Sequence, residues 1–93
     1  MIRTSLALRD LTTIANWLAD HNLDSALNFY DEVDRILILL SHHPLMGEAV
    51  DHLSPGIRRH TLGDYLIFYR PVDEGIELIR ILHGSRDIDS LSE

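Results

Sequence analysis

The sequence predicts an α+β fold, with helices in the first half of the chain and strands in the second. Across residues 5–42, apolar residues recur every three or four positions, which is the period of an amphipathic helix. Across residues 57–83, three runs rich in β-branched and aromatic residues are separated by turn-forming residues. Helices followed by consecutive strands are typical of the α+β class. We therefore expect a short N-terminal strand, an antiparallel two-helix hairpin, a three-stranded antiparallel β-meander and a short C-terminal tail.

The size and composition of the chain limit what it can be. With 93 residues, the chain has the length of one small domain, so residues 1–93 are expected to form a single domain. The absence of cysteine excludes disulfide bonds and thiolate metal sites. The start, Met1 to Thr4, lacks the apolar run of a signal peptide, and no stretch reaches the roughly 18 apolar residues of a membrane span. We therefore expect a cytoplasmic protein without membrane contact.

The first helix is predicted to follow a short strand from Ile2 to Thr4 and to end near His21. Thr4 or Ser5 can cap its N-terminus, because a hydroxyl oxygen accepts hydrogen bonds from the free N–H groups of the first turn. Spacings of three and four define its predicted inward stripe, which consists of Leu8, Leu11, Ile14, Ala15 and Leu18.

The second helix is predicted to begin with Asp24 or Ser25 as its cap and to end before Pro44 and Gly47. Only a few residues separate the two helices, which favours an antiparallel hairpin. The apolar positions of this helix also follow the helical period, and they are Ala26, Phe29, Tyr30, Val33, Ile36, Leu37 and Leu40.

The meander is predicted from residue 57 onward. Residues 48–56 suit a connecting loop, with one brief strand or turn as an alternative. The three runs are Ile57 to Leu62, Tyr65 to Val72 and Ile76 to His83. Taking Gly63-Asp64 as the first turn gives a register with the pairs His60 with Ile67, Ile67 with Ile81, and Tyr65 with His83. Because proline is awkward inside a strand, we expect the middle strand to end or bulge at Pro71.

Charge is distributed unevenly along the chain. The 8 basic residues are all arginine and face 15 acidic residues, giving a net charge of −7. Residues 5–42 hold two arginines and six acidic residues, whereas residues 57–83 hold four of each. The surplus acid argues against direct nucleic-acid binding by the chain alone, which needs a basic surface. The helices are thus expected to be acidic outside, and the sheet to present arginines.

A set of short motifs along the chain resembles the RelE/ParE toxin superfamily, most closely its ParE branch. The motifs are Asp10-Leu11, Ile14-Ala15, Pro44-Leu45-Met46-Gly47, Gly56-Ile57-Arg58, Gly63 to Arg70, Ile76 to Leu82 and His83-Gly84-Ser85-Arg86-Asp87. They cover nearly the whole chain, and their order is more specific than any one of them. The resemblance implies the same architecture that the periodicity predicts, and a toxin of a type II toxin–antitoxin module.

The ParE-like interpretation is a protein that inhibits DNA gyrase by direct contact and is neutralised by a cognate ParD-like antitoxin. The family pattern marks five target-binding candidates, which are Arg58, Tyr65, Tyr69, His83 and Arg86. The implied antitoxin surface lies on the helical hairpin, with the candidates Trp17, Leu18, Phe29, Tyr30 and Leu37. On this interpretation the chain is not an enzyme and has no small-molecule substrate.

The alternative interpretation is a RelE-like, ribosome-dependent mRNA endoribonuclease. Such cleavage requires cations near the phosphate and groups that move the proton of the 2′-hydroxyl. The candidate set is Arg58, Arg59, His60, His83 and Arg86. Against it, Leu66 occupies the position where RelE-like toxins carry an arginine, and the tail after Arg86 has no tyrosine, histidine or lysine. A degenerate member without toxicity is a third alternative, which the short first strand favours.

Each candidate also has a purely structural interpretation. Tyrosines on strands are more often part of the core than of a site, and an exposed arginine often only pairs with a nearby carboxylate. The six histidines lack the spacing of a metal site, so neither a metal ion nor another cofactor is expected.

Overall fold

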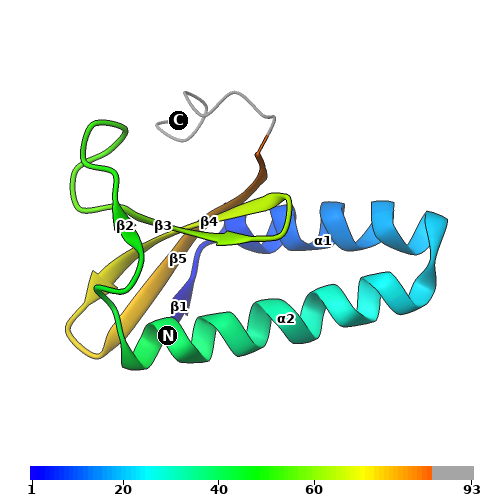
Figure 1. Cartoon of the computed structure of the whole chain (residues 1–93), viewed down its shortest axis with the longest axis horizontal. Helices are drawn as coiled ribbons and strands as arrows, with labels where there is room; N and C mark the ends of the chain where they lie inside the picture. Colours follow the sequence, from blue (N-terminus) through cyan, green and yellow to red (C-terminus); the bar gives the residue numbers. More distant parts are fainter. Residues whose placement is uncertain (85–93) are drawn as a thin grey trace.

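The structure, a computed structural model, describes residues 1–84 and consists of two helices and a five-stranded sheet (Figure 1). Its elements, in chain order, are β1 (Ile2–Arg3), α1 (Ser5–His21), α2 (Leu23–His42), β2 (Glu48–Ala49), β3 (Arg58–Leu62), β4 (Tyr65–Val72) and β5 (Gly75–His83). The α+β prediction is therefore confirmed. The expected C-terminal tail lies outside the described residues.

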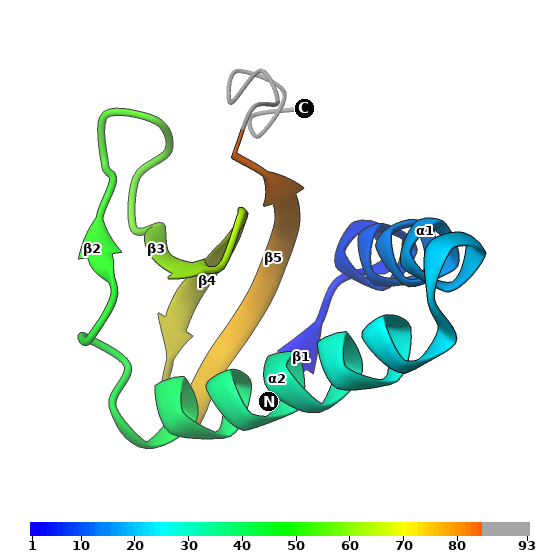
Figure 2. The same ribbon diagram turned by 45° about the vertical axis from the view of Figure 1, so that its right-hand side comes forward.

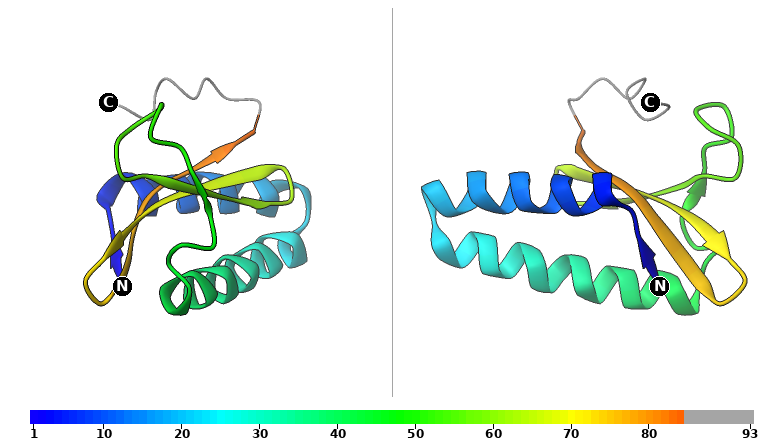
Figure 3. Two further views of the ribbon diagram at one scale, coloured as in Figure 1. Left: turned by 60° about the vertical axis from the view of Figure 1, so that its left-hand side comes forward. Right: turned by 180° about the vertical axis from the view of Figure 1, so that it is seen from behind.

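The two helices form the predicted antiparallel hairpin, which extends beyond the sheet at its closed end (Figure 3). Thr4 caps α1, and its hydroxyl oxygen accepts a hydrogen bond from the Ala7 N–H at 3.1 Å. Asn22 alone separates the helices, and its side chain accepts hydrogen bonds from the N–H groups of Asp24 and Ser25. The prediction of Asp24 or Ser25 as the cap of α2 is wrong, because the helix already begins at residue 23.

The strand order in the sheet is β1-β5-β4-β3-β2 (Figure 2). The predicted meander of β3, β4 and β5 is antiparallel throughout, while β1 joins β5 in parallel and β2 joins β3 in antiparallel fashion. We expected four strands, namely the N-terminal strand and the three strands of the meander. The sheet has a fifth, β2, because residues 48–49 pair with β3. The predicted register is confirmed in its three pairs, His60 with Ile67, Ile67 with Ile81, and Tyr65 with His83.

Pro71 does not end β4 or cause its irregularity. The strand continues to Val72, and the shift in register lies between Phe68 and Tyr69. β3 pairs with β4 only as far as Tyr69, so Pro71 has a neighbouring strand, β5, on one side only. Proline is tolerated at such a position because an N–H missing on the open side breaks no hydrogen bond of the sheet. The expectation of a break at this residue is therefore wrong.

The sheet separates two apolar clusters because side chains alternate between its faces. The larger cluster lies between the sheet and the helices, and the smaller one, with Val50, Ile57, Phe68 and Leu82, lies on the opposite face. In α1 the inward stripe contains Ala7, whereas Leu8 is 46% exposed, so including Leu8 in the stripe was wrong. Among residues 1–84, no helix is long and apolar enough to span a membrane.

Candidate functional site

Two of the predicted target-binding residues, Arg58 and Tyr69, hold the loop of residues 44–47. They face each other across β3 and β4. The Tyr69 hydroxyl accepts a hydrogen bond from the Gly47 N–H and donates one to the Pro44 carbonyl, both at 2.8 Å. The Arg58 guanidinium donates to the carbonyl oxygens of Gly47 at 2.7 Å and Leu45 at 3.2 Å. Both side chains therefore stabilise the folded chain by holding this loop in position.

The environment of Tyr69 keeps its hydroxyl protonated. Its side chain is fully buried, and this burial raises the pKa of the phenol. The hydrogen bond from Gly47 and the charge of Arg58 lower the pKa, but they offset the effect of burial only in part. There is also no room beside the hydroxyl, since a Cβ at Gly47 would lie 2.5 Å from the Tyr69 oxygen. Tyr69 thus contacts the loop directly and presents no surface to a partner.

Tyr65 and His83 lie side by side where β4 begins and β5 ends. Their ring centroids are 5.3 Å apart and the rings meet edge to face at 88°. On its other side the Tyr65 ring contacts Phe29 of α2, with centroids 5.2 Å apart. Partial burial raises the pKa of Tyr65, and the negative charge of Asp64 raises it further. Tyr65 is half-buried and His83 is exposed, so this pair, unlike Tyr69, presents side chains at the surface.

The residues of the nuclease alternative do not form one cluster in the described part of the chain. Arg58 lies opposite Tyr69 and His83 lies opposite Tyr65, which is about 13 Å away along the strand at roughly 3.3 Å per residue. Arg59 pairs with Glu48, and His60 is half-buried in the middle of β3. Arg86, the last of the set, lies outside the described residues. Within residues 1–84, no group of three or more side chains is placed to bind a metal ion.

The five antitoxin-binding candidates differ in exposure. Trp17 and Tyr30 are 58% and 40% exposed, and the indole of Trp17 lies against His21 with ring centroids 4.4 Å apart. Leu18 is half-buried. Phe29 and Leu37 belong to the core, with 8% and 0% exposure, and offer no side-chain surface. Helical periodicity did not distinguish these last two from Tyr30.

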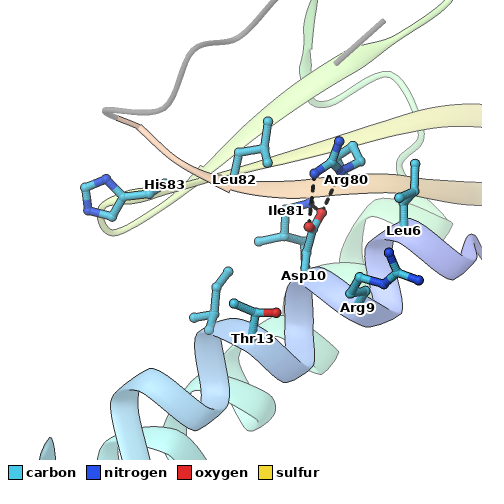
Figure 4. A pocket seen from close by; sticks show the side chains of 9 residues that line it. Leu6, Arg9, Asp10, Thr13, Arg80, Ile81, Leu82 and His83 are labelled. Atoms are coloured by element: carbon cyan, nitrogen blue, oxygen red, sulfur yellow. Dashed lines mark hydrogen bonds and ion pairs between the residues drawn. The ribbon is translucent and has the colours of Figure 1, made fainter. Parts of the chain in front are cut away.

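One contact at the α1–β5 boundary was missed by the sequence analysis. The Asp10 carboxylate accepts hydrogen bonds from Arg80 Nε at 2.8 Å, Arg80 Nη2 at 3.1 Å and the Ile81 N–H at 3.0 Å (Figure 4). These groups line a cavity of about 330 Å³ between the helix and the strand. β1 pairs with β5 only at Glu77 and Leu78. Beyond the end of β1, the Asp10 carboxylate accepts the hydrogen bond of the Ile81 N–H at this edge of the sheet. Asp10 and Arg80 are 70 positions apart in the chain, so no local pattern connects them.

The sequence analysis also missed a row of exposed apolar residues on α2, although their helical spacing is visible in the sequence. Leu23, Leu27 and Ile38 are 64%, 55% and 56% exposed. Together with Tyr30 they are spaced by four, three and eight positions, which places them on one face of the helix. This is a second apolar row beside the core stripe, and the same periodicity would have revealed it.

Comparisons with known proteins agree with the motif resemblance. The family described as "ParE toxin of type II toxin-antitoxin system, parDE" matches residues 1–88. Toxin ParE1 of Mycobacterium tuberculosis is 32% identical over 68 residues, which cover 72% of this chain and 69% of the relative. Toxin ParE1 of Caulobacter vibrioides is 33% identical over 63 residues, which cover 68% of this chain and 65% of the relative.

Proposed function

Because the chain belongs to the family of ParE toxins of type II toxin–antitoxin systems, we propose that it arrests growth by binding DNA gyrase. The inhibition is by protein–protein contact, in the cytoplasm, and requires no cofactor. A cognate ParD-like antitoxin binds the helical hairpin and neutralises the toxin. The family itself implies an antitoxin partner, whereas the gyrase target is the specific part of this proposal.

One observation favours gyrase binding over RNA cleavage: Arg58 and Arg59 of the nuclease set already bind groups within the folded chain. Arg58 donates to two loop carbonyls, and Arg59 pairs with Glu48. A phosphorane-like transition state needs cations that are aimed at the substrate and a nearby proton donor and acceptor. Arg58 lies opposite Tyr69 and His83 lies opposite Tyr65, four residues apart along β4, so these residues do not meet this requirement together.

On the target side, the proposal divides the five marked residues by what they touch. Tyr65 and His83 reach the surface at the end of β5, and Arg86 follows three positions later in the chain, so these three are the direct contacts. Arg58 and Tyr69 act indirectly, by holding the loop of residues 44–47.

The test is expression of the chain in a bacterial host with two readouts. Induction of the SOS response and accumulation of gyrase–DNA cleavage complexes are expected, and both should disappear on coexpression of the antitoxin encoded beside the toxin gene. Prompt loss of translation with cut transcripts would instead support the endoribonuclease. Neither effect, from protein that is folded, would identify the chain as a degenerate member of the family.

Arg86→Ala tests the proposed contact within the same assay. The variant should lose most of the growth inhibition while the protein remains folded and antitoxin-bound. Full growth inhibition by this variant would count heavily against a role for Arg86 at the target. Asp73→Ala is the matched control, because this exposed residue lies in the β4–β5 turn, at the far end of β5 from His83.

A further inference from the structure

The pairing of β4 with β5 changes register in the middle of the two strands. Leu78 pairs with Tyr69 and Arg80 pairs with Phe68, which leaves Ile79 as an extra residue on β5. An extra residue of this kind is a β-bulge, and the side chains that follow it point to the opposite faces from those of a regular strand. The bulge therefore decides which face of the sheet each of the last residues of β5 occupies.

The burial of the residues on either side of the bulge shows this change of face. Leu78 and Ile81 both belong to the apolar cluster under the helices, although they are three positions apart. In a regular strand, residues an odd number of positions apart lie on opposite faces. The bulge thus turns Ile81 into this core, and it places His83, two positions further, on the same face as its partner Tyr65.

The outer edge of β5 is held by β1 before the bulge and by α1 and its cap from the bulge onward. At the bulge, the Thr4 hydroxyl donates a hydrogen bond to the Ile79 carbonyl at 2.9 Å. After the bulge, the Asp10 carboxylate accepts hydrogen bonds from the Ile81 N–H and from two N–H groups of Arg80 (Figure 4). Asp10 therefore binds both the backbone and a side chain of the strand where its new phase begins.

We propose that Asp10 is a positioning residue for the target-binding end of β5. Its carboxylate holds the strand in the phase that the bulge creates, and this keeps His83 beside Tyr65 at the surface. The inference rests on the proposed function, in which this end of β5 contacts gyrase. Because the side chain of Asp10 is only 14% exposed, it acts through β5 and not by touching the target.

The bond to the Ile81 N–H is the part of the contact that depends on phase. In a strand, the N–H groups of neighbouring residues point to opposite edges, so a slip of one residue would turn the Ile81 N–H toward β4 and away from Asp10. The ion pair with Arg80 lacks this requirement, because a long arginine side chain reaches its partner from more than one direction. Positioning is thus assigned to the backbone bond, and the ion pair adds stability.

Two substitutions of Asp10 separate these contributions. Its Oδ2 accepts from the Ile81 N–H at 3.0 Å and from Arg80 Nε at 2.8 Å, while Oδ1 accepts from Arg80 Nη2 at 3.1 Å. In Asp10→Asn, the remaining oxygen can occupy the place of Oδ2 and keep the backbone bond, although the charge is lost. Asp10→Ala removes both contributions. Positioning predicts different results for the two variants, whereas a role in ion pairing alone predicts the same result.

The first measurement follows His83 in the full-length chain without any target, under conditions in which circular dichroism shows each variant to be folded. In proton NMR spectra, the edge-to-face contact between the Tyr65 and His83 rings gives nuclear Overhauser cross-peaks. These should lose most of their intensity in Asp10→Ala and remain in Asp10→Asn. Cross-peaks between His60 and Ile67, in the middle of the meander, are the internal reference and should persist in both.

The second measurement is the affinity of the same proteins for purified gyrase. Asp10→Ala should bind at least about tenfold more weakly, because only molecules with a correctly placed His83 are competent to bind, and Asp10→Asn should stay within about threefold of the unaltered chain. Asp34→Ala is the matched control, since it removes an acidic partner of arginine in an exposed pair, Arg3–Asp34, on β1 and α2. It should bind like the unaltered chain.

The outcomes distinguish this inference from the proposed function. Equal losses of ring contacts in Asp10→Asn and Asp10→Ala, or intact ring contacts in both, would overturn the inference. Intact binding by an Asp10→Ala variant that has lost the ring contacts would also overturn it, because the position of His83 would not matter to gyrase. If the unaltered chain does not bind gyrase, the proposed function fails, and the ring contacts alone decide whether Asp10 positions His83.

Discussion

The loop of residues 44–47 and an exposed apolar row on α2, the strip of Leu23, Leu27, Tyr30 and Ile38, use their side chains in opposite ways. In the loop, backbone groups are bound by Tyr69 and Arg58, and Gly47 leaves no space beside the Tyr69 hydroxyl. Along the strip, Leu23 and Leu27 expose more than half of their surface and contribute little to the core. The comparison teaches that two residues marked by the family pattern, Arg58 and Tyr69, support the fold, while residues of α2 outside that pattern present apolar surface.

This difference separates two kinds of mutational effect. A change in the loop or in the residues behind it should lower the free energy of unfolding, and any loss of toxicity would follow from that. A change on the strip should leave folding intact and alter only binding.

Gly47→Ala should have the largest effect, a loss of about 3 kcal/mol in the free energy of unfolding. The new Cβ would lie 2.5 Å from the Tyr69 hydroxyl oxygen and 2.9 Å from the Arg59 carbonyl oxygen, so the loop must move. Urea denaturation followed by circular dichroism measures the loss. Gly63→Ala is the control: nothing lies within 4 Å of its Cβ, but its φ of 58° costs about 1 kcal/mol. Equal losses in the two variants would contradict the steric argument.

Asp10→Asn should lower the free energy of unfolding by about 2 kcal/mol. The side chains of Asp10 and Arg80 are only 14% and 13% exposed, so a neutral amide at residue 10 removes a charge–charge attraction that solvent screens only weakly. Asp34→Asn is the matched control, because the Arg3–Asp34 pair is 38% and 58% exposed and should contribute less than about 0.5 kcal/mol. A loss in the control as large as in Asp10→Asn would show that burial does not set the cost.

Tyr69→Phe should cost about 1–2 kcal/mol, because it leaves the buried Gly47 N–H without its acceptor. The free energy of unfolding is again measured with urea. Tyr30→Phe on the strip serves as the control, since the hydroxyl of this exposed residue makes no hydrogen bond within residues 1–84 that its removal would break. If the two variants were equally stable, the hydroxyl of Tyr69 would have no structural role.

Alkaline pH should weaken the protein through the same side chain. Burial, the largest cause, raises the pKa of folded Tyr69 above the value of about 10 in the unfolded chain. Below pH 10 both states are protonated and this stabilisation is fully present; as pH rises further, the unfolded chain loses its proton first and stability falls. Unfolding measured between about pH 8 and pH 11 should show this fall, and it should be smaller in Tyr69→Phe. An identical slope in both proteins would exclude Tyr69 as its cause.

The sequence predicted the fold class, both helices and the register of the meander because each depends on local patterns. Periodicity marks the helices, and Gly63-Asp64 is a turn whose position aligns His60 with Ile67. The cap of α2 was misplaced by two or three residues, because Asp24 and Ser25 are as suitable in isolation as Asn22. The brief strand β2 was left as an alternative, because two residues pair only when β3 is already in place.

The candidate site was less predictable because it depends on contacts between distant residues. No pattern connects Tyr69 with Gly47, 22 positions away, so the sequence could not tell a loop-binding tyrosine from a surface one. Likewise, helical spacing allowed both Phe29 and Tyr30 in the predicted apolar stripe of α2, but only the packing against the sheet decides which of them is covered. Exposure in the folded chain is the quantity that the sequence did not contain.

Leu27→Gln should have the smallest effect on folding and the most selective effect on binding. Leu27 is 55% exposed, and glutamine is a good helix former, so the free energy of unfolding should change by less than about 0.5 kcal/mol. Binding of the cognate antitoxin to the helical hairpin, measured with the purified proteins, should nevertheless weaken several-fold, since one side chain of the strip becomes polar. Val33→Gln, at a residue that is 1% exposed on the core-facing side of the same helix, should unfold the protein or cost several times more. If Leu27→Gln destabilised the fold as much as it weakened binding, the strip would belong to the core and the contrast with the loop would fail.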